Sequence, residues 1–135
     1  MVRLKAIRSA ILLAPLALVA CGESVDPEMA AICRMTLPAL NAAGARIAVT
    51  RVAPGADART VRVEYSVTGG QGASPAQGLR RRYVVCAFSA TPPSGAQPDL
   101  VGIDTDTGPV TGASVYLMKR YWLSTPEARE ADPGR

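Results

Sequence analysis

The sequence contains no histidine, and its 135 residues include only one tryptophan, one phenylalanine and four tyrosines. The lack of histidine excludes Ser-His-Asp and Cys-His catalysis and histidine-ligated zinc, and it removes the most common general base at neutral pH. Aromatic side chains are also too few to supply a stacking platform for nucleic-acid bases. The composition therefore argues against nucleic-acid binding and against the best-known classes of hydrolase.

Long hydrophobic runs are equally scarce. The main one, residues 10–20, follows the basic residues Arg3, Lys5 and Arg8. A membrane-spanning helix needs roughly 20 apolar residues, and this run is about half as long. A basic segment followed by a short apolar stretch is the pattern of an export signal, so residues 1–20 are predicted to be a signal peptide.

The end of this segment, Leu18-Val19-Ala20-Cys21, resembles the lipobox of bacterial lipoproteins, in which aliphatic and small residues precede an obligatory cysteine. The resemblance implies that residues 1–20 are removed, that the sulfur of Cys21 carries a diacylglycerol, and that its new amino group is acylated. Two or more acyl chains anchor a protein stably to a membrane. The alternatives are an ordinary signal peptide with a chance cysteine and a buried apolar helix of a cytoplasmic protein.

Gly22 follows this cysteine at the position where many inner-membrane lipoproteins carry aspartate. The resemblance therefore favours the outer membrane over the inner membrane, with the protein facing the periplasm and residues 21–26 forming a short lipidated linker. Removal of residues 1–20 takes away three of the fifteen basic residues, so twelve Arg or Lys oppose eleven Asp or Glu and the net charge is about +1. A charge so close to zero gives no electrostatic reason to expect a nucleic-acid partner.

Three cysteines are present, and lipidation of Cys21 would leave Cys33 and Cys86. An even pair in an oxidising envelope predicts a disulfide. The bridge would close a loop of about 54 residues and stabilise the fold by roughly 4 kcal/mol in the chain-entropy model. A redox-active pair is the alternative, but no Cys-x-x-Cys spacing supports it.

The remaining sequence predicts one α+β domain at residues 27–124. Asp26 and Pro27 have the pattern of a helix start, and residues 60–67 alternate apolar and polar side chains as a half-buried strand does. The predicted elements, in order, are a helix at 27–37, strands at 46–52, 60–67, 79–89 and 100–103, and a helix at 112–123. The expected architecture is an N-terminal helix, an antiparallel sheet of three to four strands and a C-terminal helix packed on the sheet.

The C-terminal region combines an apolar helix with a charged end. The helix at 112–123 is expected to face the sheet with Val115, Leu117, Met118, Tyr121 and Trp122. Residues 125–135 are charged and contain prolines, so they are predicted to be a disordered tail.

Arg80, Arg81 and Arg82 form the densest charge run after residue 20. On a strand, Arg80 and Arg82 share one face and Arg81 lies on the other. Guanidinium groups bind phosphates and carboxylates in a two-point geometry, so this run could bind an anionic lipid or an envelope protein. A solvated strand end that discourages aggregation is the alternative. Arg82, and Tyr116 on the last helix, are expected to be exposed.

Acidic residues suggest two further sites. Asp104 and Asp106 alternate as in a calcium loop, but Pro109 follows and Val115 stands where a bidentate glutamate is needed. Glu64 could meet either aspartate as a hydrolytic carboxylate pair, but any chain with eleven acidic residues allows such a pair. We predict no catalytic residue, no metal site and no cofactor.

These features together predict a non-enzymatic binding or structural module of the bacterial envelope, attached to the membrane through Cys21. Its expected partner is an envelope protein or an anionic lipid. The alternative is a small-ligand or lipid-binding periplasmic carrier, which would need an apolar cavity of about 300 Å³ or more. Residues 61–88 are similar to small secreted bacterial domains without an assigned function, and this resemblance transfers no site.

Overall fold

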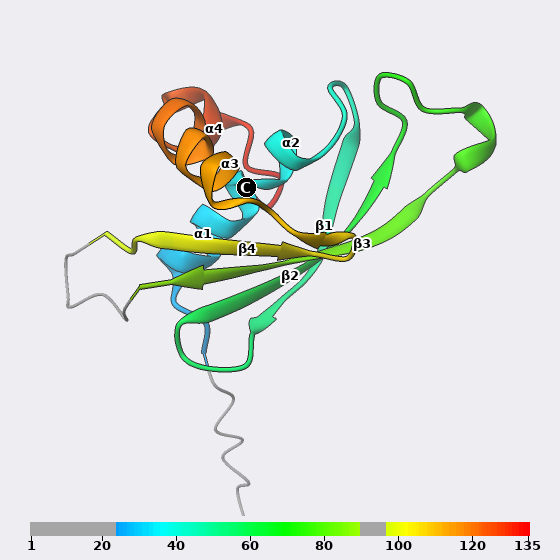
Figure 1. The fold of residues 1–135 in the computed structure, drawn as a ribbon. Coiled ribbons are helices and arrows are strands. Elements are labelled where there is room, and N and C mark those ends of the chain that lie inside the picture. Colours follow the sequence, from blue (N-terminus) through cyan, green and yellow to red (C-terminus); the bar gives the residue numbers. More distant parts are fainter. Residues whose placement is uncertain (1–23, 90–96) are drawn as a thin grey trace, which may run out of the picture.

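A computed structural model of the chain describes residues 24–89 and 97–135. Its centre is an antiparallel sheet of five strands in the order β1-β2-β3-β4-β5, with helices on one face (Figure 1). The prediction of an α+β fold with an antiparallel sheet is confirmed, and the sheet has one strand more than expected. The predicted signal peptide, the lipobox and Cys21 lie outside the described residues.

The elements follow one another along the chain with short connections. The strands are β1 (Arg46–Pro54), β2 (Thr60–Thr68), β3 (Arg80–Phe88), β4 (Leu100–Thr105) and β5 (Gly108–Pro109). The helices are α1 (Pro27–Met35), α2 (Leu37–Leu40), the 3₁₀ turn η1 (Pro75–Gln77), α3 (Gly112–Met118), the π-helix η2 (Lys119–Leu123) and α4 (Pro126–Glu130). Within the described ranges, no helix is both long enough and apolar enough to cross a membrane.

Strand β2 defines the two faces of the sheet. Its residues Val61, Val63, Tyr65 and Val67 are each at most 1% exposed, whereas the residues between them are half-buried. This strict alternation means that one face is covered and the other is open to solvent. The covered face continues onto β3 through Val84, Cys86 and Phe88, all of which are buried.

Helix α1 supplies much of the cover. Its start is fixed by Asp26, whose carboxylate accepts hydrogen bonds from the backbone N–H groups of Glu28 (3.0 Å) and Met29 (2.9 Å). Met29 and Ile32 are buried and belong to the same core cluster as the inward residues of β2 and β3. The helix therefore packs across the middle of the sheet.

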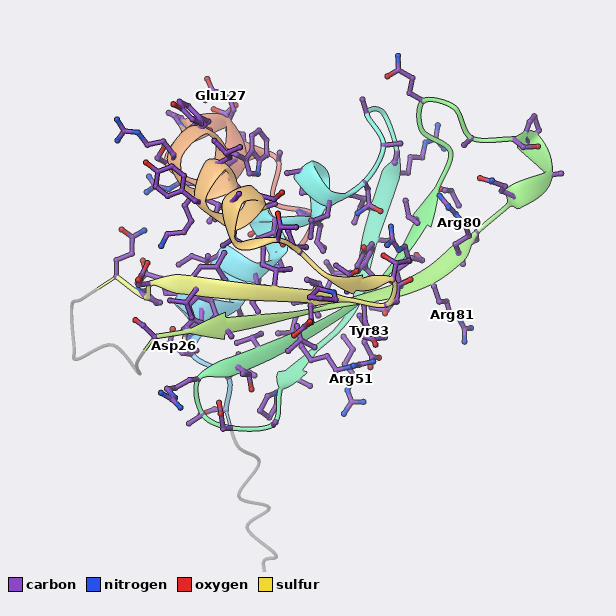
Figure 2. The ribbon with its side chains drawn as sticks, viewed as in Figure 1. Asp26, Arg51, Arg80, Arg81, Tyr83 and Glu127 are labelled. Carbon is purple, nitrogen blue, oxygen red and sulfur yellow. A yellow bond between two sulfur atoms is a disulfide. The ribbon has the colours of Figure 1, made fainter. Side chains whose placement is uncertain are left out.

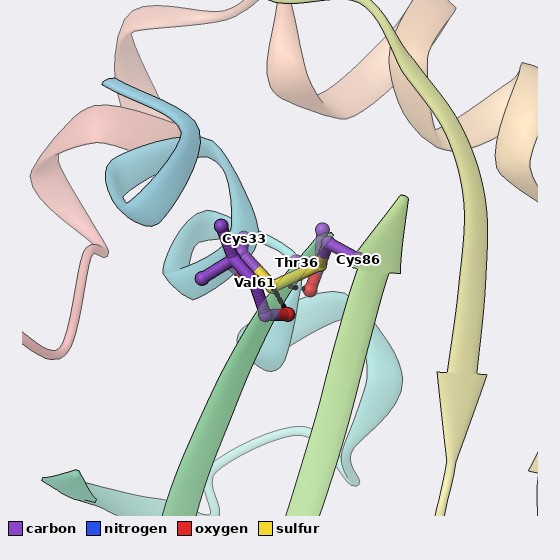
Figure 3. Close-up of a disulfide and its surroundings, with 4 residues drawn as sticks. All are labelled: Cys33, Thr36, Val61 and Cys86. Carbon is purple, nitrogen blue, oxygen red and sulfur yellow. Dashed lines mark hydrogen bonds between the residues drawn. A yellow bond between two sulfur atoms is a disulfide. The ribbon is translucent and has the colours of Figure 1, made fainter. Parts of the chain in front are cut away.

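A disulfide fastens α1 to the sheet. Cys33 and Cys86 are bonded, their Cα atoms lie 5.8 Å apart, and neither residue is exposed to solvent. Figure 3 shows the bridge between the helix and β3, with the Cys33 sulfur 3.8 Å from the carbonyl oxygen of Val61 on β2. The hydroxyl of Thr36 donates to the carbonyl oxygen of Cys33 at 2.7 Å and closes the end of the helix. The disulfide that the sequence predicts is present.

The last helical region, α3 followed by η2, buries a narrower stripe than the sequence predicts. Val115 is buried, and Met118 and Trp122 pack against the core. These three residues follow the i, i+3, i+7 spacing of one helix face. Leu117 and Tyr121 lie outside that stripe and are 53% and 71% exposed, so the prediction that they face the sheet is wrong.

Residues 125–135 are ordered, which corrects the prediction of a disordered tail. The hydroxyl of Thr125 accepts a hydrogen bond from the backbone N–H of Ala128 and caps α4, and Ala128 is completely buried. Beyond the helix, Asp132 pairs with Arg34 of α1 at 2.8 Å. A cap and a distant ion pair hold the segment on the fold, despite its high charge.

Candidate functional site

The open face of the sheet carries a group of charged and aromatic side chains. Arg51 comes from β1, Arg62 and Glu64 from β2, and Arg81 and Tyr83 from β3, and we call these five residues the arginine face. Arg51 lies opposite Glu64, and Glu64 lies opposite Tyr83, so they form a row across three strands. Figure 2 shows Arg51, Arg81 and Tyr83 on the side of the sheet away from the helices.

Arg51 reaches this face because β1 contains a bulge. Val49 pairs with Tyr65, but the next pairing joins Arg51 to Glu64, so Thr50 is an extra residue without a partner of its own. Without the bulge, strict alternation would place Arg51 on the same side as Val49, towards the core. The irregularity therefore turns a charged side chain onto the open face.

Arg62 is held in place by two neighbours. Its guanidinium carbon lies 3.8 Å from the centre of the Tyr83 ring, a cation–π contact. Its Nε donates to a carboxylate oxygen of Glu64 at 3.1 Å. The charges of Arg62 and Glu64 offset one another, so the electrostatic character of the arginine face comes from Arg51 and Arg81.

Arg51 and Arg81 are exposed, and within residues 24–89 and 97–135 neither belongs to an ion pair. They border a shallow depression of about 630 Å³ that is also lined by Arg62, Tyr83 and Ser66. Guanidinium groups present rigid, forked donors that match phosphate and carboxylate oxygens. The arrangement can therefore bind an anionic group at the surface without displacing an existing partner.

The run of three arginines does not form a single site. Arg81 lies on the arginine face, whereas Arg80 is exposed on the opposite side of β3 (Figure 2). Arg82 donates to Asp106 at 3.1 Å and to the side-chain oxygen of Asn41 at 3.0 Å, and its side chain is only 18% exposed. The prediction of an exposed Arg82 is wrong, because this residue ties β3 to the end of α2 and to the β4–β5 turn.

The acidic residues that the sequence singles out are not brought together. Asp106 is occupied by Arg82, and Asp104 lies on β4 opposite Val85, two strands away from Glu64 on β2. In the part of the chain that the structure describes, no three His, Cys, Asp or Glu residues gather in a way that could hold a metal ion.

A second depression lies on the other side of the molecule. It has a volume of about 610 Å³ and lies between α1, the start of β4, η2 and the C-terminal end. Ile32, Met35 and Leu123 supply apolar lining, and Arg129 and Arg135 contribute charge at its border. A groove of this size is within the range of small-ligand sites.

No protein-family model matches the sequence, and no curated protein or solved structure is detectably similar to it. The functional argument therefore depends on the residues of this chain alone.

Sequence analysis missed Arg51, Arg62 and Tyr83 as members of a site. The alternation of β2 places Arg62 and Glu64 together on the open face, and that signal could have identified them. The register between β2 and β3, which brings Tyr83 beside them, and the bulge before Arg51 are products of tertiary structure and leave no local signature.

Proposed function

We propose that the protein is a non-enzymatic module of the bacterial cell envelope that is anchored by an acylated Cys21 and binds anionic groups through the arginine face. The observation that carries the proposal is the exposure of Arg51 and Arg81 beside one another's strands, with no carboxylate paired to either among the described residues. Exposed arginines without a partner are suited to recognise phosphate or carboxylate groups of another molecule.

Two features support the envelope location. The Cys33–Cys86 disulfide is of the kind that persists in oxidising compartments and is rare in the cytosol. The lipobox Leu18-Val19-Ala20-Cys21 precedes the first described residue, Ser24, by a very short stretch. The proposed molecule is thus a small disulfide-braced domain directly above the outer-membrane surface, facing the periplasm.

The anchor is tested by replacing Cys21 with serine. Membranes from cells that express the native chain or Cys21→Ser are washed in concentrated salt, which screens charge-based attachment but leaves acyl anchoring intact. The native protein should remain in the membrane fraction, with a mass that includes acyl chains, and the variant should be washed off. Ser24→Ala, a change of similar size three residues later, is the matched control and should remain bound.

If Cys21→Ser stays in the salt-washed membranes to the same extent as the native chain, the lipoprotein assignment is wrong. Covalent capture tests the binding role separately. A photoreactive residue at position 81 should give a discrete adduct, whereas the same probe at the exposed Tyr116, on the opposite side of the sheet, should not. Equal labelling from both positions would contradict a role for the arginine face.

A second candidate function, a small-ligand or lipid carrier, is favoured by the groove of about 610 Å³ beside α1. Ala31 lines this groove, so Ala31→Trp should fill it and weaken saturable binding of a fluorescent fatty acid. Ala39→Trp, on the exposed side of α2, is the matched control. Absence of saturable binding to the native chain would remove this candidate.

A further inference from the structure

The described chain begins beside the turn between β1 and β2. Val25 packs against the core, and with Ser24 it borders a small depression formed by Pro54 and Thr60, where β1 ends and β2 begins. Figure 1 shows this entry on the side of the fold away from α3 and α4. Cys21 lies three residues before Ser24, so the two cannot be more than about 11 Å apart.

The arginine face extends from this same end of the sheet. Arg62 is the third residue of β2, close to the β1–β2 turn, and Arg81 lies opposite Ser66 farther along the strand. The distance from Thr60 to Ser66 along the strand is about 20 Å. A tether that short leaves the domain little freedom, so a surface that starts at the tether and runs for about 20 Å can lie flat on the plane that holds the anchor.

The charge of this face complements an anionic plane. Arg46, at the start of β1, is exposed opposite Thr68 and adds a third arginine beyond Arg51 and Arg81. Between them lie small side chains, among them Ala48 and Ser66, which pair with each other. The result is a broad, shallow, basic surface, which suits a layer of headgroups better than a single deeply bound ligand.

We infer that the arginine face rests on the anionic headgroups of the membrane in which Cys21 is anchored, so that the sheet lies parallel to that membrane. This inference depends on the proposed lipid anchor and names the occupant of the proposed site. Each basic residue near an anionic bilayer strengthens attachment about five-fold. The anchor keeps the face at a high local concentration of headgroups, so modest electrostatic attraction is sufficient to orient the domain.

Electrostatic docking is measured without the anchor. The secreted chain carrying Cys21→Ser is mixed with vesicles of phosphatidylglycerol or of phosphatidylcholine, and the bound fraction is determined by co-sedimentation. Arg51→Gln combined with Arg81→Gln removes two charges from the arginine face. Arg120→Gln combined with Arg129→Gln, two exposed arginines on η2 and α4, removes the same charge elsewhere and is the control.

The chain should prefer phosphatidylglycerol, and added salt should weaken the binding. The Arg51 and Arg81 pair of substitutions should reduce binding by roughly 25-fold, and the control pair by less than about two-fold. Equal binding to both lipids, or equal losses in the two double variants, would overturn the inference. Capture of a protein at position 81 together with equal binding to both lipids would assign the face to that protein instead.

Orientation is measured on the acylated chain in vesicles. A fluorophore is attached at Ala48→Cys, on the open face, or at Tyr116→Cys, on α3, and is quenched by lipids brominated near the headgroup. Strong quenching at position 48 and weak quenching at position 116 is expected, and the reverse pattern or equal quenching overturns the inference. If Cys21→Ser washes off and the quenching pattern is equal, the anchor holds and only the orientation fails.

Discussion

Arg34 of α1 and Asp132 near the C-terminus form a two-point ion pair. The Nε and Nη2 atoms of the arginine lie 2.9 Å and 2.8 Å from the two carboxylate oxygens. Both side chains are largely shielded from solvent, and the backbone N–H of Gly134 also donates to the carboxylate at 2.9 Å. The pair joins the last turn of the first helix to a segment that follows the last helix, and so closes the fold.

Asp132→Asn should therefore loosen α4. The loss of unfolding free energy is expected to be about 1 to 2 kcal/mol, between the values for exposed and buried pairs. Urea unfolding gives the magnitude, and carboxypeptidase digestion should remove the C-terminal residues faster than in the native chain. Glu130→Gln, an exposed change on α4, is the control, and an equal loss in that variant would show that the ion pair has no special role.

The pair also makes stability depend on pH. Burial raises the pKa of Asp132, but hydrogen bonds from Arg34 and Gly134 and the charges of Arg34 and Arg135 outweigh it and hold the pKa below its usual range. The folded pKa is thus lower than the unfolded value of about 3.9. The contribution of the pair is present above that unfolded value and is lost as the pH falls through the folded pKa.

The free energy of unfolding should consequently differ between the native chain and Asp132→Asn at neutral pH, and the difference should vanish in strong acid. Urea titrations across the acidic range measure it. A difference that stays constant at all pH values would mean that the variant acts through packing and not through the charge of the carboxylate.

Removal of the disulfide should cost far more. Cys33→Ala combined with Cys86→Ala is expected to lower the unfolding free energy by about 4 kcal/mol, because the bridge restricts a loop of about 54 residues in the unfolded chain. Urea unfolding gives the loss, and a reducing agent should destabilise the native chain but not the double variant. Free thiols in freshly isolated protein, found by mass spectrometry, would contradict the bridge.

Trp122 makes a hydrogen bond that can be removed with little change in packing. Its indole Nε1 donates to the carbonyl oxygen of Met35, the last residue of α1, at 2.6 Å. Trp122→Phe should lower the unfolding free energy by about 1 to 2 kcal/mol, since it leaves that carbonyl without this donor. Tyr121→Phe changes the adjacent, exposed aromatic residue and should be neutral. Equal stability of both variants in thermal unfolding would exclude a structural role for the bond.

The parts of the fold that could be predicted are those encoded locally. The alternation of Val61, Val63, Tyr65 and Val67 directly indicates a strand with one buried face, and Asp26 and Pro27 mark the start of α1. The disulfide followed from the number of cysteines that remain after Cys21, and its two partners required no knowledge of the sheet.

The parts that could not be predicted depend on distant partners. β5 is only Gly108–Pro109, and it exists because Gly108, with φ at +122°, closes a tight turn onto β4. Arg34 and Asp132 are 98 residues apart in sequence, so nothing local reveals that the C-terminal segment has a docking point. The arginine face was hidden for the same reason, since a bulge and two registers assemble it.

The path of the disulfide through the fold also decides how the molecule responds to mechanical load. A pull between the N-terminal end and the C-terminal part enters through α1, crosses from Cys33 to Cys86, and continues along the chain after β3. Strands β1 and β2 lie between the two cysteines in sequence and stand outside this route. A domain on a short leash therefore keeps its first two strands, and the arginines Arg51 and Arg62 on them, free of tension while the rest of the chain is stretched.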